Sequence, residues 1–525
     1  MSAVPDLTAP RAVAAQASAP AVLASSEGYR GILKATALIG GASALNIVVG
    51  LVRTKVLAVL LGPAGLGLLG LYGSIVDLVR SVSQLGINSS GVRQIAAAAG
   101  TGDARRIAFT AGVLRRVSLL LGLLGAGLLV AASSPLSTLT FGSAERASSV
   151  ALLGAAVFFR IVSDSQGALI QGLRRIGDFA RVGFFGALLG SLASIALVVV
   201  WGEQAVVPSL VAMAAGAALV SWWYARRVPM ATVSLRWAEV RRESGALLGL
   251  GLAFMASGLI MMASAYGVRL IVLRHDGLDA AGYYQAAWTL GGLYVGFVLQ
   301  AMGADFYPRL VALIHDDARS NQVVNEQAQV SLLLAGPGMA ATLTLASLVL
   351  SVFYSSAFGE AAETLRWVCL GMTLRVVTWP MGFIIVARGD QRLFFITELA
   401  WGLVSVGLAW MLVSRYGHRG AGMAFFGAYV FHALMLYPIV RSLSGFRWSI
   451  ATARSVLVFG VSVAAVFMAF QWWPTAWALA TGALVTLAST VYSLRELLRL
   501  ASPQHLPASV RRLLGALRMH SQGPP

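Results

Sequence analysis

The sequence predicts an all-α polytopic membrane protein, and three observations lead to this fold class. Of the 525 residues, 58% are hydrophobic and only 11% are charged, whereas a soluble domain is about half apolar and a quarter charged. The mean hydropathy of the chain is +0.77. Apolar stretches of the length that crosses a bilayer, about 20 residues per helix, follow one another along the sequence. A large catalytic ectodomain is therefore excluded.

We expect about fourteen transmembrane helices, one for each long apolar stretch. The predicted helices lie at about 33–61, 68–92, 110–132, 149–171, 183–202, 207–225, 248–272, 284–304, 329–353, 365–387, 395–414, 421–440, 455–471 and 477–494. The N-terminal stretch to about Glu27 is rich in Ala, Pro and Ser and lacks a basic segment followed by an apolar core. It therefore indicates a disordered tail and not a signal peptide.

The basic residues predict which way these helices face. If the N-terminus lies inside the cell, nearly all Lys and Arg residues of the loops and tails fall on the inner side. The exceptions are Arg146, Arg274, Arg415 and Arg419. By the positive-inside rule both termini are then cytoplasmic. The net charge of +18 is mostly a topology signal, and we expect no nucleic-acid partner.

Several features recur at one spacing, which predicts an internal repeat. Arg53 and Arg269 are 216 residues apart, and Arg160 and Arg375 are 215 apart. The segments 62–67 and 277–282 share the pattern G-x-x-x-x-G. Six helices per repeat is an even number, so both copies enter the membrane in the same sense, as in parallel-repeat transporters.

The repeat divides the chain into two six-helix lobes that face each other across a cleft, with two helices appended. The predicted boundaries are 1–30 for a disordered cytoplasmic tail, 31–228 for the first lobe, 229–441 for the second lobe, 442–494 for helices 13 and 14, and 495–525 for a basic amphipathic tail on the inner leaflet.

Arginines within the predicted helices are the candidate binding residues. Charges at this depth are costly, so they usually face a cavity or one another. Guanidinium groups match phosphate oxygens bidentately, which predicts a central cavity for a phosphate or pyrophosphate group. The repeat-related candidates are Arg53, Arg160, Arg269 and Arg375, and Lys55 and Arg80 extend this patch.

The alternative is that each cation is neutralised locally. Asp164 follows Arg160 by four residues and Asp77 precedes Arg80 by three, so each pair shares a helix face. Either Asp77 or Asp164, if unpaired, could instead carry a coupling proton. The single Cys369, the scattered histidines and the lack of a phosphate-binding loop predict no metal, no cofactor and no catalytic residue. We therefore expect a carrier and not an enzyme.

Two regions of the chain carry a family resemblance. In the run from 34 to 95 it lies in Arg53-Thr-Lys-Val-Leu-Ala, Gly62-Pro-Ala-Gly-Leu-Gly and Leu85-Gly-Ile-Asn, and further on in Tyr283-Tyr-Gln-Ala-Ala-Trp and Phe306-Tyr-Pro-Arg. These segments resemble bacterial O-antigen and polysaccharide flippases of the multidrug/oligosaccharidyl-lipid/polysaccharide exporter superfamily. The subgroup they resemble most is the O-antigen translocase type, which includes lipid III flippases.

The resemblance implies a fourteen-helix carrier in the bacterial plasma membrane. Such a carrier moves an undecaprenyl-pyrophosphate-linked oligosaccharide, such as an O-antigen unit, to the outer leaflet by alternating access through a cationic central cavity. Its partners are the lipid-linked oligosaccharide and membrane lipids, and polysaccharide polymerase and chain-length proteins are further expected partners.

Two other functions remain open at this point. An ion-coupled drug exporter of the same superfamily is disfavoured by the excess of intramembrane arginines over carboxylates. A membrane glycan polymerase or ligase is disfavoured because the longest predicted outer connection, 133–148, is short and poor in catalytic side chains.

Overall fold

The computed structural model describes residues 26–231, 233 and 237–500, and this part of the chain contains helices and no strands. The helices of the first half are α1 (Ser26–Gln84), α2 (Ile87–Gly100), α3 (Ala104–Ala131), α4 (Ser133–Phe141), α5 (Ala147–Gly172), α6 (Ile176–Trp201) and α7 (Val206–Ala225). Those of the second half are α8 (Trp237–Ala312), α9 (Asp317–Thr344), α10 (Ala346–Phe353), α11 (Ala361–Ala387), α12 (Gln391–Tyr416), α13 (His418–Ser444), α14 (Ile450–Trp472) and α15 (Thr475–Leu500).

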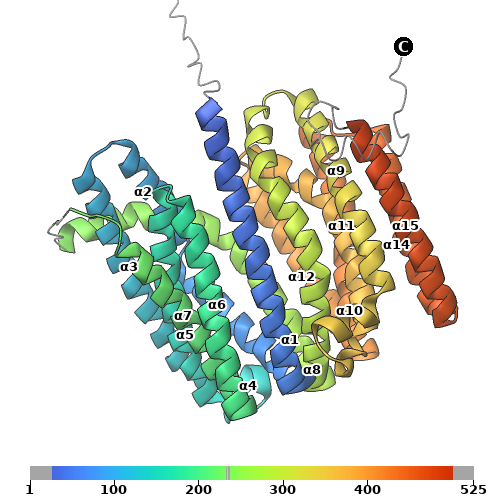
Figure 1. The fold of residues 1–525 in the computed structure, drawn as a ribbon, viewed down its shortest axis with the longest axis horizontal. Coiled ribbons are helices and arrows are strands. Elements are labelled where there is room, and N and C mark those ends of the chain that lie inside the picture. The colour runs from blue at the N-terminus through green and yellow to red at the C-terminus, as the bar shows by residue number, and fades with distance from the viewer. Residues whose placement is uncertain (1–25, 232, 234–236, 501–525) are drawn as a thin grey trace, which may run out of the picture.

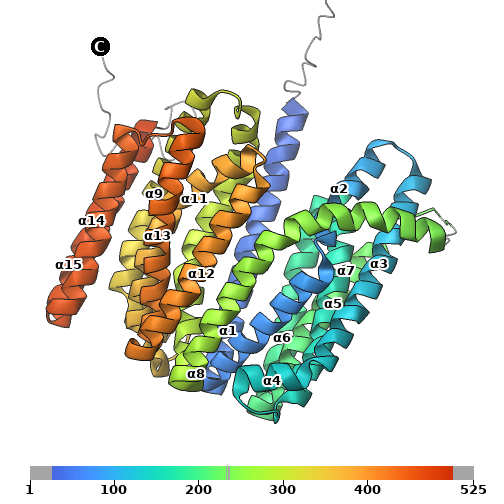
Figure 2. The same cartoon turned by 180° about the vertical axis from the view of Figure 1, so that it is seen from behind.

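The helices form two lobes that lie side by side. Helices α1 to α7 make the N-lobe, α8 to α13 make the C-lobe, and α14 and α15 pack on α9 at the outside of the C-lobe (Figures 1 and 2). The ribbons of the lobes converge at the end that carries α4 and α10. They diverge towards the opposite end, where α1 begins and α15 ends (Figure 1).

The predicted fold class is confirmed. Within the described residues, nine helical segments are long and apolar enough to cross a membrane, or ten if the bent pair α9 and α10 counts as one span. Two of these segments, Gly41–Gln84 with 44 residues and Ile176–Ala225 with 50 residues, have the length of two spans at about 20 residues each.

The structure corrects several predicted helix boundaries. The range 68–92 is broken, because Leu85 (φ 48°) and Gly86 (φ 68°) adopt the left-handed conformation that ends α1. The range 329–353 is bent by 84° where α9 gives way to α10. Helix α8 begins already at Trp237, well before the predicted start at 248. The amphipathic segment of the tail 495–525 and nearly all of the tail 1–30 lie outside the described residues.

Two glycines fix the bends of the long helices α1 and α8. Gly62 has φ 65° and ψ −169°, and Gly277 has φ 86° and ψ −173°. This region of backbone conformation is open essentially only to glycine. Pro63 then occupies the first position of the new helical segment, where its missing N–H has no intrahelical acceptor. The 215-residue repeat thus reappears as the same bend in both lobes.

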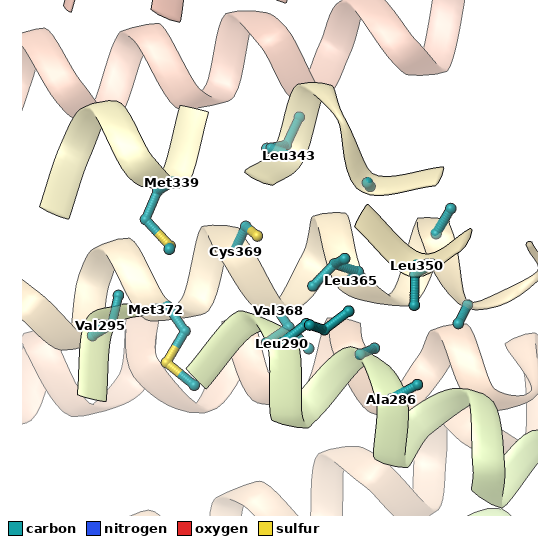
Figure 3. Packing of buried hydrophobic residues seen from close by; sticks show 14 of the residues in the cluster. Ala286, Leu290, Val295, Met339, Leu343, Leu350, Leu365, Val368, Cys369 and Met372 are labelled. Carbon is teal, nitrogen blue, oxygen red and sulfur yellow. The ribbon is translucent and has the colours of Figure 1, made fainter. Parts of the chain in front are cut away.

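The C-lobe has a closely packed apolar core that holds its helices together. Figure 3 shows side chains of α8, α9, α10 and α11 packed in this core, with Leu290, Leu343 and Leu365 among them. Cys369 is fully buried here. Such packing leaves few voids and transmits displacement of one helix to the next, so the lobe is suited to move as a unit.

Candidate functional site

A cavity of about 370 Å³ lies between the lobes near the middle of α1 and α8. The N-lobe contributes Arg53 and Asp77 from α1 and Arg160 from α5, and the C-lobe contributes Arg269 and Gln285 from α8. Three of the four repeat-related arginines therefore line one cavity. Among the described residues that line this cavity, one is acidic, namely Asp77.

Arg269 is held in a fixed orientation by the C-lobe. Its side chain is 9% exposed. Its Nε donates to Gln285 Oε1 at 2.9 Å, and its Nη1 donates to the carbonyl oxygen of Ala265 at 3.0 Å. Gly70 of the N-lobe makes room for this arrangement, because a Cβ there would lie 2.7 Å from Gln285 Oε1. These two hydrogen bonds fix the orientation of the Arg269 guanidinium and so set the direction of its remaining donors.

Arg53 and Arg160 each have a donor that the described part of the chain does not satisfy. The Nε of each is buried and has no hydrogen-bond partner in the described part of the chain. Arg53 Nη1 contacts the sulfur of Met213, and Arg160 Nη2 lies 3.6 Å from Asp77 Oδ1. Leaving a buried charged donor unpaired is costly, so each of these two side chains keeps an unmet demand for an acceptor.

The carboxylates pair differently from the predicted pattern. Asp164 accepts from Arg80 Nη1 at 2.7 Å and from Gln84 Nε2 at 3.3 Å, and not from the expected Arg160. Asp77 lies 3.8 Å from Arg80 Nε, as its sequence spacing suggested, but also reaches Arg160. Arg80 is thus an ion-pair residue beside the cavity and does not line it.

Arg375 and Lys55 lie away from the cavity. Arg375 lines a separate space of about 50 Å³ inside the C-lobe, beside Trp401 and Tyr429, because α11 presents this position to α8, α12 and α13. The expectation that all four repeat-related arginines line one central cavity is therefore met by three of them. Lys55 donates from Nζ to the carbonyl oxygen of Ser351 at 2.8 Å.

Contacts between the lobes close one side of the cavity. The Lys55 bond joins α1 of the N-lobe to the C-terminal end of α10 in the C-lobe. In the reverse direction, Arg274 of α8 donates from Nη2 to the carbonyl oxygens of Thr138, at 2.9 Å, and Leu139 at the end of α4. Both cations thus meet the negative end of a helix dipole. We call these two contacts the latches.

The two G-x-x-x-x-G segments cross at the same side. A Cβ on Gly67 would lie 2.9 Å from the backbone nitrogen of Gly282, and a Cβ on Gly282 would collide with the carbonyl oxygen of Pro63. Only glycine permits this backbone contact. The shared pattern of the two segments thus marks the place where the backbones of the lobes meet.

Some lining residues were not predicted from the sequence. Met213 and Tyr354 line the cavity, but apolar and aromatic residues are so common in this chain that neither carries a signal. Arg274 was assigned only to the outer charge count. Its position three residues before Gly277, at the bend of α8, is the clue that could have placed it at the lobe contact.

Comparisons with known proteins agree with this architecture. A family model described as polysaccharide biosynthesis protein matches residues 56–363, more than half of the chain. The lipid III flippase of Escherichia coli (strain K12) is 21% identical over 405 residues, which cover 76% of this chain and 95% of that protein.

Solved structures share the fold. The lipid II flippase MurJ in an inward closed conformation superposes with a TM-score of 0.65 at 15% identity, over 88% of this chain and 99% of that one. An inward-facing multidrug resistance MATE family transporter of the MOP superfamily gives a TM-score of 0.60 at 17% identity, over 76% and 96% of the two chains.

These relatives are named as flippases or transporters, which confirms the expectation of a non-enzymatic, multi-pass membrane protein. The family match covers the N-lobe from α1 onwards and extends into the C-lobe as far as the start of α11. The chain therefore belongs to the polysaccharide biosynthesis protein family and has the fold of the multidrug/oligosaccharidyl-lipid/polysaccharide exporter superfamily.

Proposed function

We propose that this protein is a flippase for a lipid-linked oligosaccharide, specifically an undecaprenyl-pyrophosphate-linked O-antigen or related unit. The observation that carries the proposal is the cavity between the lobes, where Arg53, Arg160 and Arg269 face one carboxylate, Asp77, among the described lining residues. Two of these arginines have buried donors that find no partner among the residues that the structure describes. A pyrophosphate is negatively charged and has many acceptor oxygens, so it can accept hydrogen bonds from several guanidinium groups at once.

The geometry supports transport by alternating access. A hydrated glycan and its pyrophosphate cannot cross hydrocarbon unaided, whereas the polyprenyl tail can stay in the bilayer. With both termini in the cytoplasm of a bacterial cell, the latched side of the protein faces outwards and the diverging ends of the lobes face inwards. The lobes then receive the headgroup from the inner leaflet and release it to the outer leaflet after the latches open.

The competing functions fit the cavity less well. A cationic drug would meet three guanidinium groups and one carboxylate, and the resulting repulsion disfavours it. A polymerase or ligase needs groups that form and break covalent bonds, and the relatives are carriers. Polysaccharide polymerase and chain-length proteins are the partners that would use the translocated unit.

The test replaces two cavity arginines together. We expect cells with Arg160→Ala plus Arg269→Ala to accumulate polyprenyl-pyrophosphate-linked glycan on the cytoplasmic leaflet at normal protein abundance, with surface glycan reduced at least tenfold. The matched control is Arg375→Ala, which removes a repeat-related arginine outside the cavity. Normal surface glycan in the double variant, or an equal loss in the control, would contradict the assignment of the cargo to this cavity.

A further inference from the structure

A second polar cavity, of about 330 Å³, lies within the N-lobe between α1, α2, α5 and α6. Its chemistry differs from that of the cavity between the lobes, because amides and hydroxyls predominate among its polar groups and none of its described lining residues is an arginine. The side chains that matter here are Asn46, Asn88, Ser163, Asp164, Gln171 and Phe179. We call this space the amide cavity.

The amide cavity and the arginine-lined cavity are both bordered by α1 and α5. Arg160, Asp164, Gly167 and Gln171 follow one another on α5 at spacings of three or four residues, which places them on one face of the helix. Arg80 lies between a carboxylate of each cavity, since it pairs with Asp164 at 2.7 Å and reaches Asp77 at 3.8 Å. Gln171 lies about 16 Å along α5 from Arg160 at 1.5 Å per residue.

Asn46 points to a missing hydrogen-bond donor in the amide cavity. Its Oδ1 is buried and has no partner in the described part of the chain. Gly183 of α6 keeps the space beside it open, because a Cβ there would lie 3.3 Å from Asn46 Nδ2. A buried acceptor without a donor is destabilising, so a ligand hydroxyl at this position would repair the deficit.

We propose that the amide cavity binds the glycan of the lipid-linked cargo while the arginine-lined cavity binds its pyrophosphate. Sugar hydroxyls both donate and accept, as amides do, whereas a phosphate needs the donors that arginine supplies. Phe179 offers a flat apolar surface to a sugar ring. The inference rests on the proposed function and makes this wall of the N-lobe the part that selects the glycan.

The experiment compares two probes on the purified full-length protein by native mass spectrometry. One probe is undecaprenyl pyrophosphate, and the other is the same lipid bearing an N-acetylglucosamine trisaccharide. We expect the trisaccharide lipid to bind more tightly to the native protein. In Asn46→Leu that advantage should fall about fivefold to tenfold, the loss expected from one or two hydrogen bonds, while affinity for the bare lipid stays unchanged.

Two further variants make the result specific. Gly183→Val narrows the amide cavity from α6 and should also reduce the advantage of the trisaccharide lipid. Gln322→Leu removes an exposed amide of α9 that lines neither cavity, and it should bind both probes like the native protein. If Asn46→Leu or Gly183→Val unfolds at a lower temperature than the Gln322→Leu control, the Asn88→Ala variant is used in its place. We expect Asn88→Ala to reduce the advantage of the trisaccharide lipid in the same way.

The outcomes separate this inference from the proposed function. Equal binding of the two probes to the native protein, or equal losses for both probes in Asn46→Leu, would overturn the glycan site and leave the flippase proposal standing. If neither probe bound the native protein, that result would instead contradict the flippase proposal itself. Loss of both probes in Arg160→Ala, together with selective loss in Asn46→Leu, would support the division of labour between the cavities.

Discussion

The pair formed by Arg80 and Asp164 shows how single residues set the stability of the N-lobe. Their side chains are 20% and 26% exposed, so the pair is partly desolvated. Removing one partner of a fully buried pair costs about 3–5 kcal/mol, because the other charge is left uncompensated. With residual solvent contact, and with Asp77 still 3.8 Å from Arg80 Nε, we expect Asp164→Ala to lower the free energy of unfolding by about 2 kcal/mol.

A second substitution tests whether the charge of Arg80, left only with the more distant Asp77, is the cause. Adding Arg80→Met to Asp164→Ala removes that charge, so the double variant should unfold at a higher temperature than Asp164→Ala alone. The measurement is thermal unfolding of the purified proteins in detergent. A double variant less stable than the single one would show that Arg80 contributes mainly through contacts other than this ion pair.

The sequence identified much of the candidate site at this scale, but not the direction of each side chain. Intramembrane arginine is rare and costly, so Arg53, Arg160 and Arg269 stood out in an apolar chain. The repeat predicted that Arg375 lies on the helix that corresponds to α5. It did not predict which face of α11 points towards the N-lobe. That rotation is set by packing against α8, α12 and α13, which no local pattern encodes.

At the scale of elements, the bends of α1 and α8 depend on two glycines. We expect Gly62→Ala and Gly277→Ala each to cost about 1–3 kcal/mol, since a side chain strains this backbone conformation. Gly50→Ala is the matched control on α1: its site is helical and open, so alanine should stabilise it slightly. Thermal unfolding of the three variants measures the difference, and a similar result at positions 50 and 62 would contradict the role of the bend.

The helices were predicted more reliably than their ends and bends. Long apolar stretches mark the helices because each must cover about the thickness of the bilayer. The predicted helices 33–61 and 68–92 left a gap at 62–67, yet the helix resumes directly after Gly62. One glycine in an unusual conformation is enough to redirect a helix, and the sequence cannot distinguish this from a longer loop.

At the scale of the whole molecule, the repeat predicted two similar lobes but not the state in which they meet. That state depends on contacts between residues distant in the sequence, such as Gly67 with Gly282 and the hydroxyls of Tyr266 and Thr140, which lie 2.6 Å apart. Such contacts exist in one conformation of a carrier and are lost in another. The sequence must remain compatible with both, so it does not reveal which one prevails.

The latches therefore offer a way to shift that balance. We expect Lys55→Ala and Arg274→Ala each to raise the outward-open population about tenfold, because each removes a hydrogen bond from a charged donor, worth about 1.5–3 kcal/mol. A cysteine introduced as Leu66→Cys, at a buried cavity position, reports opening through its labelling by impermeant maleimide in intact cells, since the native Cys369 is buried. Arg415→Ala removes an exposed arginine at the latched side and should leave labelling unchanged. Equal labelling in the latch variants and this control would show that the latches do not hold the lobes closed.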